Sequence, residues 1–254
     1  MKVTLLQTDI QWAQPELNIT RADRLIATAE ESDLYVLPEM WSTGFATNPQ
    51  GIAHEEADNE ALQWMLQTAR LRRCAICGSL AVHLSDGTYR NRHYFADGRS
   101  EQLNYYDKHH LFTYSHENLQ YTPGQHHAVV NYNGFRLLLL TCYDLRFPGW
   151  CRYATGREYD AIVIVANWPA ARQLQWQLLI RARAIENQCY VVAVNRVGED
   201  NFGHYAGASA AIDALGHTIR QCRLHQEQAL TVTLDFEELL RRRNKFRVLD
   251  ERDT

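Results

Sequence analysis

The segment around Cys142 combines a very apolar run with charged residues. Four consecutive leucines, 137–140, predict the buried interior of a strand, and Cys142 follows one residue later. Asp144 and Arg146 come within the next four positions. A cysteine that only fills a core has no need of charged neighbours, whereas a reactive one needs rigid support and polar groups. The pattern therefore favours a chemical role for Cys142.

Two more reactive side chains stand just past apolar segments in the same way. Glu39 follows residues 35–38, and Lys108 follows residues 105–107. Functional sites in open α/β sheets form at strand ends, so we expect Glu39, Lys108 and Cys142 to converge. Alone, each would usually be a core thiol or a surface charge. The joint pattern predicts a site.

Composition excludes several classes of protein. The chain has 254 residues, 46% of them hydrophobic and 22% charged, which predicts one globular domain over residues 1–254. The net charge of -4 argues against a nucleic-acid partner. We find no apolar run long enough to span a membrane, and the N-terminal residues resemble a strand more than a signal peptide. The six cysteines are therefore expected to be reduced thiols in a cytoplasmic protein.

Hydrophobic periodicity predicts mixed strands and helices. Helices are expected near residues 15–29, 61–73, 149–157, 171–187 and 236–242. Strands are expected near 3–8, 34–37, 74–83, 89–95, 102–106, 128–132, 135–141, 161–166, 189–194, 205–212, 217–223 and 229–234. Residues 107–127 form a long polar connection, rich in histidine. Two sheets covered by helices would satisfy the layer rules for an α+β protein.

Several motifs occur together and in order. They are Pro38-Glu39-Met40, Asp107 to Phe112 (DKHHLF), Tyr121 to Gly124 (YTPG), Cys142 to Pro148 (CYDLRFP), Ala166 to Pro169 (ANWP), Arg181 to Asn187 (RARAIEN) and Val194 to Gly198 (VNRVG). On these segments the chain resembles the nitrilase superfamily of carbon–nitrogen hydrolases, and within it the omega-amidases. The resemblance extends from residue 3 to about residue 235. It implies a four-layer αββα sandwich that needs no metal and no cofactor.

The resemblance also implies a Glu–Lys–Cys triad. Cys142 would attack an amide carbonyl and form a thioester, with Glu39 taking and returning the proton. Lys108 and the backbone N–H of Tyr143 would stabilise the oxyanion. Glu117 matches a second acid of many family members and would orient Lys108 and the substrate amide, with a solvated loop residue as the equal alternative.

The expected small-molecule substrates are 2-oxo dicarboxylic acid monoamides, namely 2-oxoglutaramate and 2-oxosuccinamate. This follows from likeness to omega-amidases over residues 39–45. The far carboxylate of such a substrate needs a cation or several N–H donors. Arg146 is a candidate by position, although it could equally pair with Asp144 as scaffold. Trp41, Phe45 and Trp168 are expected to wall a small pocket.

Family members commonly pair into homodimers through helices, so the helices expected at 149–157 and 171–187 are candidates for that surface. Three alternatives stay open. One is a hydrolase of another amide, a carbamoyl compound or a nitrile, and a second is a non-catalytic interaction subunit. The third is a thiol-redox protein using Cys74 and Cys77, although positions i and i+3 of a strand point to opposite faces. The pairs His109-His110 and His126-His127 suggest loop polarity more than a metal site.

Overall fold

Most of the strands form two six-stranded sheets, and two further strands pair with each other. The computed structural model describes residues 1–251. The first sheet has the order β14 (Gln228–Thr233), β1 (Lys2–Gln7), β2 (Leu34–Val36), β3 (Ala75–His83), β4 (Tyr89–Asp97), β5 (Gln102–Asp107). The second has the order β13 (Thr218–Gln221), β12 (Ala210–Ile212), β9 (Tyr190–Asn195), β8 (Ala161–Ala166), β7 (Phe135–Thr141), β6 (Ala128–Tyr132). The central strands β1–β2–β3 and β7–β8–β9 run parallel, so their carboxyl ends share an edge in each sheet.

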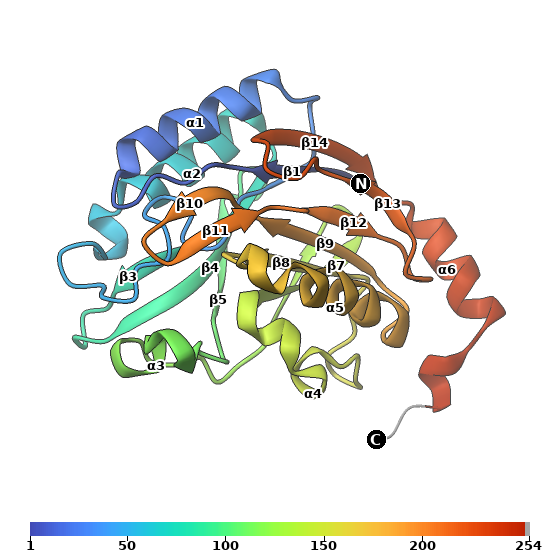
Figure 1. Ribbon diagram of the computed structural model, residues 1–254. Coiled ribbons are helices and arrows are strands. Elements are labelled where there is room, and N and C mark those ends of the chain that lie inside the picture. Colours follow the sequence, from blue (N-terminus) through green and yellow to red (C-terminus); the bar gives the residue numbers. More distant parts are fainter. Residues whose placement is uncertain (252–254) are drawn as a thin grey trace.

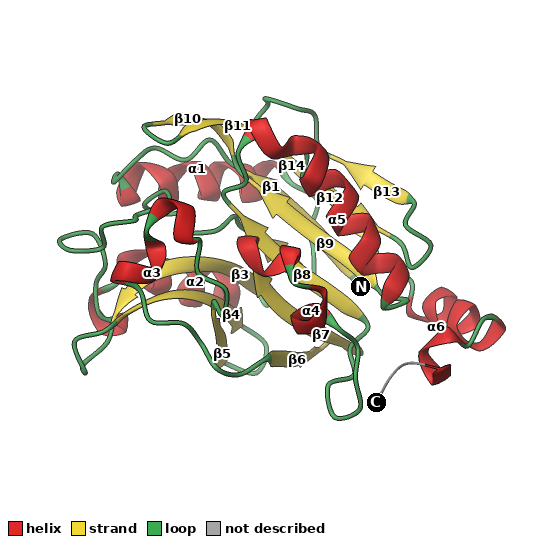
Figure 2. Cartoon of the chain, turned by 60° about the horizontal axis from the view of Figure 1, so that its bottom comes forward, coloured by secondary structure: helices red, strands yellow, loops and turns green. Residues whose placement is uncertain are grey.

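Helices cover the outer face of each sheet. Figure 1 shows α1 (Pro15–Thr28) and α2 (Glu60–Arg72) on one side of the paired sheets and α5 (Gln173–Glu186) on the other. Figure 2 shows α6 (Phe236–Lys245) beyond the end of α5, and the single turns α3 (Glu117–Gln120) and α4 (Pro148–Cys151). The expected four-layer αββα sandwich of the α+β class is confirmed.

The alternation of side chains along the first sheet explains these layers. Val3 and Leu5 of β1 point into the core between the sheets, whereas Leu6 packs under α1 and α2. In β2, Val36 faces the inner core and Tyr35 faces the helices. Because both faces of these parallel strands are covered, both sets of positions are apolar.

Strand β7 is the most deeply buried support of the predicted site. Leu137 to Leu140 have no exposed surface, and the strand is paired on both sides, antiparallel with β6 and parallel with β8. His93 of β4 fixes it from the opposite sheet through a 3.1 Å hydrogen bond between Nδ1 and the carbonyl of Leu140. Burial lowers the pKa of His93 to about 4, so the neutral ring donates this bond. The residue that follows β7 is therefore held rigidly.

Two predicted elements are wrong. The helix expected at 149–157 is only the single turn α4, because the backbone becomes extended at Arg152. The chain then turns at Gly156, which has a φ of +76°, and a bridge forms between Ala154 and Arg157. The strand expected at 205–212 is interrupted at Gly207, which has a φ of +73° and where a Cβ would lie 2.3 Å from Gln7. The separate pieces are β12 and β11 (Gly203–Ala206), and β11 pairs with β10 (Val197–Asp200), which the sequence did not predict.

Cys74 and Cys77 lie on opposite sides of the first sheet. Cys77 belongs to the core between the sheets, and Cys74 belongs to the layer under α1 and α2. Both are free thiols, and burial raises the pKa of Cys74 to about 11. This placement gives the redox alternative no support. No helix within residues 1–251 is both long and apolar enough to cross a bilayer.

Candidate active site

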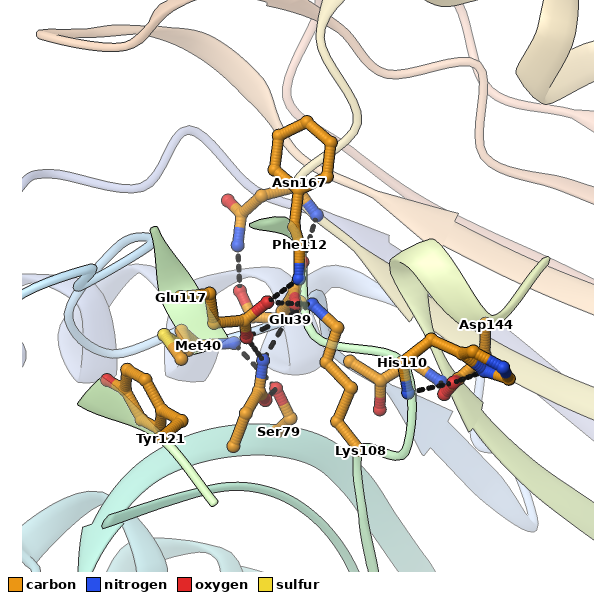
Figure 3. A network of polar contacts seen from close by, with 12 residues as sticks. Glu39, Met40, Ser79, Lys108, His110, Phe112, Glu117, Tyr121, Asp144 and Asn167 are labelled. Carbon is orange, nitrogen blue, oxygen red and sulfur yellow. Dashed lines mark hydrogen bonds and ion pairs between the residues drawn. The ribbon is translucent and has the colours of Figure 1, made fainter. Parts of the chain in front are cut away.

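Glu39 and Lys108 meet where β2 and β5 end, and Glu117 joins them from the long connection. Lys108 Nζ lies 2.8 Å from Glu39 Oε1 and 2.9 Å from Glu117 Oε2 (Figure 3). None of the three side chains has exposed surface. The structure therefore brings three ionisable groups, far apart in sequence, into one buried cluster.

Asn91 bridges the two carboxylates, and the sequence reasoning did not identify it. Its Nδ2 donates to Glu39 Oε1 at 2.8 Å and to Glu117 Oε1 at 3.0 Å. Its Oδ1 accepts from the hydroxyl of Ser79, which in turn accepts from the N–H of Met40. This chain of bonds fixes which end of the amide faces the carboxylates. A buried asparagine inside a predicted strand was the available signal, since such a group needs partners.

Asn167 holds the other side of Glu39. Its backbone N–H donates to Glu39 Oε2 at 2.9 Å, and its Nδ2 donates to the backbone carbonyl of Glu39 at 2.6 Å (Figure 3). Asn167 follows β8, so the strand-end argument that identified Glu39 also applies to it. Both oxygens of the Glu39 carboxylate are thereby held in place by hydrogen bonds.

The electrostatics of the cluster keep Lys108 charged. Burial disfavours the ammonium form, but the negative charges of Glu117 and Glu39 outweigh it and raise the pKa of Lys108. For Glu117, burial is the larger effect, and it raises the pKa together with the charge of Glu39 and against the charge of Lys108. Lys108 is therefore a permanent cation between two carboxylates.

Cys142 stands at the turn after β7 in a strained backbone conformation. Its φ is +46°, in the left-handed region that non-glycine residues rarely adopt. It is partly exposed and lines the same cavity as Lys108. Burial of the sulfur and the negative charge of Glu39 raise the pKa of the thiol, against the opposing charge of Lys108. The resting group is therefore a neutral thiol that needs a base to act as a nucleophile.

Asp144 fixes this turn, as the sequence suggested. Its carboxylate accepts from the backbone N–H of Thr141 at 3.1 Å, from the hydroxyl of Tyr106 at 2.7 Å, and from His110 through both the backbone N–H and Nδ1 at 2.9 Å. These bonds connect the turn of Cys142 to the end of β5, where Lys108 lies. Arg146 is not paired with Asp144, so its interpretation as a scaffold partner of Asp144 is wrong.

A cavity of about 430 Å³ opens above Cys142 and Lys108. Phe45, Tyr143, Arg146 and Trp168 line it. Other segments that the sequence did not assign to a pocket supply further lining residues, namely Phe112, Asn167, Arg172, Phe202 and Tyr205.

Trp41 is not part of this cavity. It is 1% exposed and packs under α2, with its ring 5.1 Å from that of Trp64. The turn after Glu39 directs Trp41 toward Gly78 and away from Cys142. We therefore assign Trp41 to the core, which corrects the expectation that it walls the pocket.

The described part of the chain, residues 1–251, contains no group of three or more His, Cys, Asp or Glu side chains placed to hold a metal ion. Three of the four paired histidines instead stack on aromatic rings. His109 and His127 each lie 3.7 Å from the ring of Trp150, and His110 lies 3.7 Å from that of Phe147. They stabilise the loops around the turn of Cys142.

A thiol on a rigid turn, a carboxylate beside it and a cation facing the same cavity can perform nucleophilic attack on a carbonyl. The carbon-nitrogen hydrolase family model matches residues 2–244, so the chain belongs to that family.

Particular relatives are enzymes of amide hydrolysis. The chain is 40% identical to the omega-amidase YafV of Yersinia enterocolitica, over all of this chain and 97% of the relative. It is 33% identical to the 2-oxoglutaramate amidase of Bacillus subtilis, over 98% of this chain and 96% of the relative. The crystal structure of XC1258 from Xanthomonas campestris, a family protein with an arsenic adduct in its active site, superposes with a TM-score of 0.94 at 37% identity. That match covers all of this chain and 97% of the other.

Proposed function

We propose that this protein is an omega-amidase that hydrolyses the terminal amide of small 2-oxo dicarboxylic acid monoamides, such as 2-oxoglutaramate and 2-oxosuccinamate. The products are the 2-oxo acid and ammonia. The observation that carries the proposal is the buried Glu39–Lys108–Glu117 cluster beside a neutral Cys142 thiol, at the base of one cavity. The omega-amidase and 2-oxoglutaramate amidase relatives support the choice of substrate.

In the first half-reaction, Glu39 accepts the thiol proton as Cys142 Sγ bonds to the amide carbon. The carbonyl electron pair moves to the oxygen, which Lys108 stabilises. One N–H of Lys108 can donate to both oxygens of Glu117, because Nζ lies 2.9 and 3.1 Å from them. Another N–H of the ammonium group then remains for the substrate oxygen. Tyr143 is the second residue of the helical turn that starts at Cys142, so its backbone N–H has no partner within that turn and can be the second donor.

The tetrahedral intermediate then loses ammonia. The C–N bond breaks, and Glu39 gives the proton to the departing nitrogen, which leaves a thioester on Cys142. Water attacks that thioester while Glu39 takes one of its protons. The C–S bond breaks, and the proton returns from Glu39 to the sulfur. Glu117 accepts from Lys108 and from the N–H of Phe112, and it orients Lys108 throughout.

The experiment that tests the substrate measures ammonia release by the wild-type enzyme from a panel of amides. We expect 2-oxoglutaramate and 2-oxosuccinamate to give kcat/KM values at least about 100-fold above those of glutamine, asparagine and a simple nitrile. The reason is that a hydrogen bond between a charged group of the protein and the matching group of the substrate typically contributes about 1.5–3 kcal/mol. Preferred turnover of the nitrile or of an uncharged amide would contradict the proposed substrate. The assignment of the protein as a carbon–nitrogen hydrolase would remain. No turnover of any amide would favour the non-catalytic alternative.

We also propose that the protein is a homodimer that pairs through α5. Three apolar side chains of that helix are exposed on one face, Leu174, Leu178 and Ile185, with exposed fractions of 64%, 58% and 52%. They are spaced by four and seven residues, so they form one stripe along the helix. A second copy of the same helix would bury this stripe around a twofold axis. The single turn α4 is too short to contribute a helix to it.

Replacing Leu178 by Glu is expected to convert the dimer to a monomer at micromolar concentration, with Kd raised at least about 10-fold, because it places a charge in the apolar stripe. Sedimentation velocity measures the change. Leu71→Glu is the matched control, since Leu71 is 75% exposed but lies on α2. A wild-type monomer, or a Leu178→Glu variant that remains dimeric, would contradict the proposed interface.

Two further assignments belong to this proposal. The enzyme is cytoplasmic, because all six cysteines are free thiols and Cys142 has to stay reduced to act. The described residues 1–251 form one domain, since one apolar core includes strands of both sheets together with α5, and residues 252–254 of the expected domain lie outside the described part.

A further inference from the structure

Two arginines face the cavity without an acidic partner. Arg146 and Arg172 both line the cavity of Cys142, and both also line a hollow next to it. Within residues 1–251, neither side chain forms an ion pair. Most partly buried arginines of a folded protein are paired, so two unpaired ones at one cavity need an explanation.

Aromatic rings hold both guanidinium groups in place. Arg146 Cζ lies 4.8 Å from the ring centre of Trp168, and Arg172 Cζ lies 5.4 Å from that of Phe112. Trp168 connects the two, because its Nε1 donates to the backbone carbonyl of Arg172 at 2.7 Å. Its own backbone N–H is held by Asn195 Oδ1 at 2.8 Å. One buried tryptophan thus contacts the guanidinium of Arg146 and fixes the backbone of Arg172, and such fixed cations preorganise a site for an anion.

The charged side chains that line the cavity are all positive. No Asp or Glu side chain is among its lining residues. The carboxylates of Glu39 and Glu117 lie beneath the cavity, have no exposed surface and are bound to Lys108. The positive charge of Arg146 and Arg172 is therefore not compensated by the protein, and a bound anion would compensate it.

We propose that Arg146 and Arg172 together bind the carboxylate at the far end of the substrate, with the 2-oxo group as a further acceptor. The pair also excludes amino acids. The α-ammonium of glutamine would meet two guanidinium groups and find no carboxylate on the lining, whereas the 2-oxo group of 2-oxoglutaramate accepts hydrogen bonds. This inference rests on the proposed function for its substrate, but the anion site can be tested without it.

The first test compares alkylation of Cys142 by iodoacetate and by iodoacetamide, which differ chiefly in the charge of one end. We expect the ratio of the iodoacetate rate to the iodoacetamide rate to fall at least about 10-fold in Arg172→Gln and in Arg146→Gln, and further in the double variant. Arg152→Gln is the control, because Arg152 is exposed and does not line the cavity. A ratio unchanged from that of wild type in both single variants would overturn the proposal.

The second test measures hydrolysis. For 2-oxoglutaramate, KM should rise about 10–100-fold in Arg172→Gln, with a smaller change in kcat, because a charge-assisted bond to the non-reacting end is lost. The preference for 2-oxoglutaramate over glutamine should narrow at the same time. Arg172→Lys keeps the positive charge but not the paired N–H donors, so its KM for 2-oxoglutaramate should lie between that of Arg172→Gln and that of wild type. A rise in KM that is equal for an uncharged amide would show a general loss of structure and overturn the anion site.

The two proposals can fail separately. If the alkylation ratio falls but wild type does not hydrolyse 2-oxoglutaramate, the anion site stands and the proposed substrate is wrong. If 2-oxoglutaramate is hydrolysed with an unchanged KM in both arginine variants, the substrate stands and the anion site is wrong.

Discussion

Replacing Glu39 by Gln is expected to lower kcat for 2-oxoglutaramate by about 10³-fold or more, which is within the usual range for loss of a general base that acts in two steps. The substitution keeps the size of the side chain and one acceptor oxygen for Lys108 and Asn91. What it removes is the group that accepts a proton from Cys142 and then from water. Both the formation and the hydrolysis of the thioester should slow.

Although Glu39→Gln should lose amide hydrolysis, it should make the thiol of Cys142 easier to alkylate. The negative charge of Glu39 raises the pKa of Cys142, and Lys108 lowers it. Without the charge of Glu39, the folded-state pKa of the thiol falls. The pH midpoint for alkylation of Cys142 by iodoacetamide should therefore shift to lower pH in Glu39→Gln, although amide hydrolysis is lost. A pH series of alkylation rates on both proteins measures this shift.

Glu117→Gln is the matched control for burial and charge. Glu117 is as deeply buried as Glu39 and contacts the same lysine. In the proposed mechanism it orients Lys108 but exchanges no proton with the substrate, so this variant should retain at least about ten times more activity than Glu39→Gln. If the two variants lose equal activity, or if the alkylation midpoint of Glu39→Gln rises, the assignment of Glu39 as the base is wrong.

Much of the site could be predicted because it follows one structural rule. Lys108 and Cys142 come directly after a strand and Glu39 comes three residues after one, and strand ends gather at the edge of a sheet. The same rule applies to Asn167 after β8. Asn91 is different, since it lies within β4, where an alternating pattern does not reveal which polar side chain faces another layer. Its role depends on how the connection that contains Glu117 folds back.

The walls of the cavity could not be predicted in the same way. Phe112, Arg172 and Phe202 come from three separate connecting segments, and their proximity depends on tertiary packing. Trp41 was assigned to the pocket because it is close to Glu39 in sequence, but the turn between them reverses its direction. Closeness in sequence is a poor guide once the chain leaves a strand.

The fold itself followed from periodicity, and one of its two errors came at a glycine. Apolar runs at β7, β8 and β9 predicted strands, and the structure shows that these strands pair in parallel. Gly207 adopts a positive φ and ends β11 where the hydrophobic pattern would have continued the strand, whereas α4 ends at Arg152, where the backbone becomes extended. A glycine inside an apolar pattern can mark a sharp change of direction that composition does not reveal.

Cys142→Ala is expected to abolish hydrolysis, with a loss of at least about 10³-fold, since a covalent mechanism cannot proceed without its nucleophile. The substitution removes only the sulfur, from a side chain that is partly exposed. The backbone support from β7 and from the Asp144 bond to Thr141 remains, so the variant should fold. A loss of activity can then be assigned to the chemistry.

The most direct test of the account is therefore ammonia release from 2-oxoglutaramate, measured for wild type and Cys142→Ala at equal concentration, with circular dichroism to establish that both are folded. We predict steady release by wild type and a rate for Cys142→Ala that is indistinguishable from the background without enzyme. A folded Cys142→Ala variant that releases ammonia at a substantial fraction of the wild-type rate would contradict the thioester mechanism.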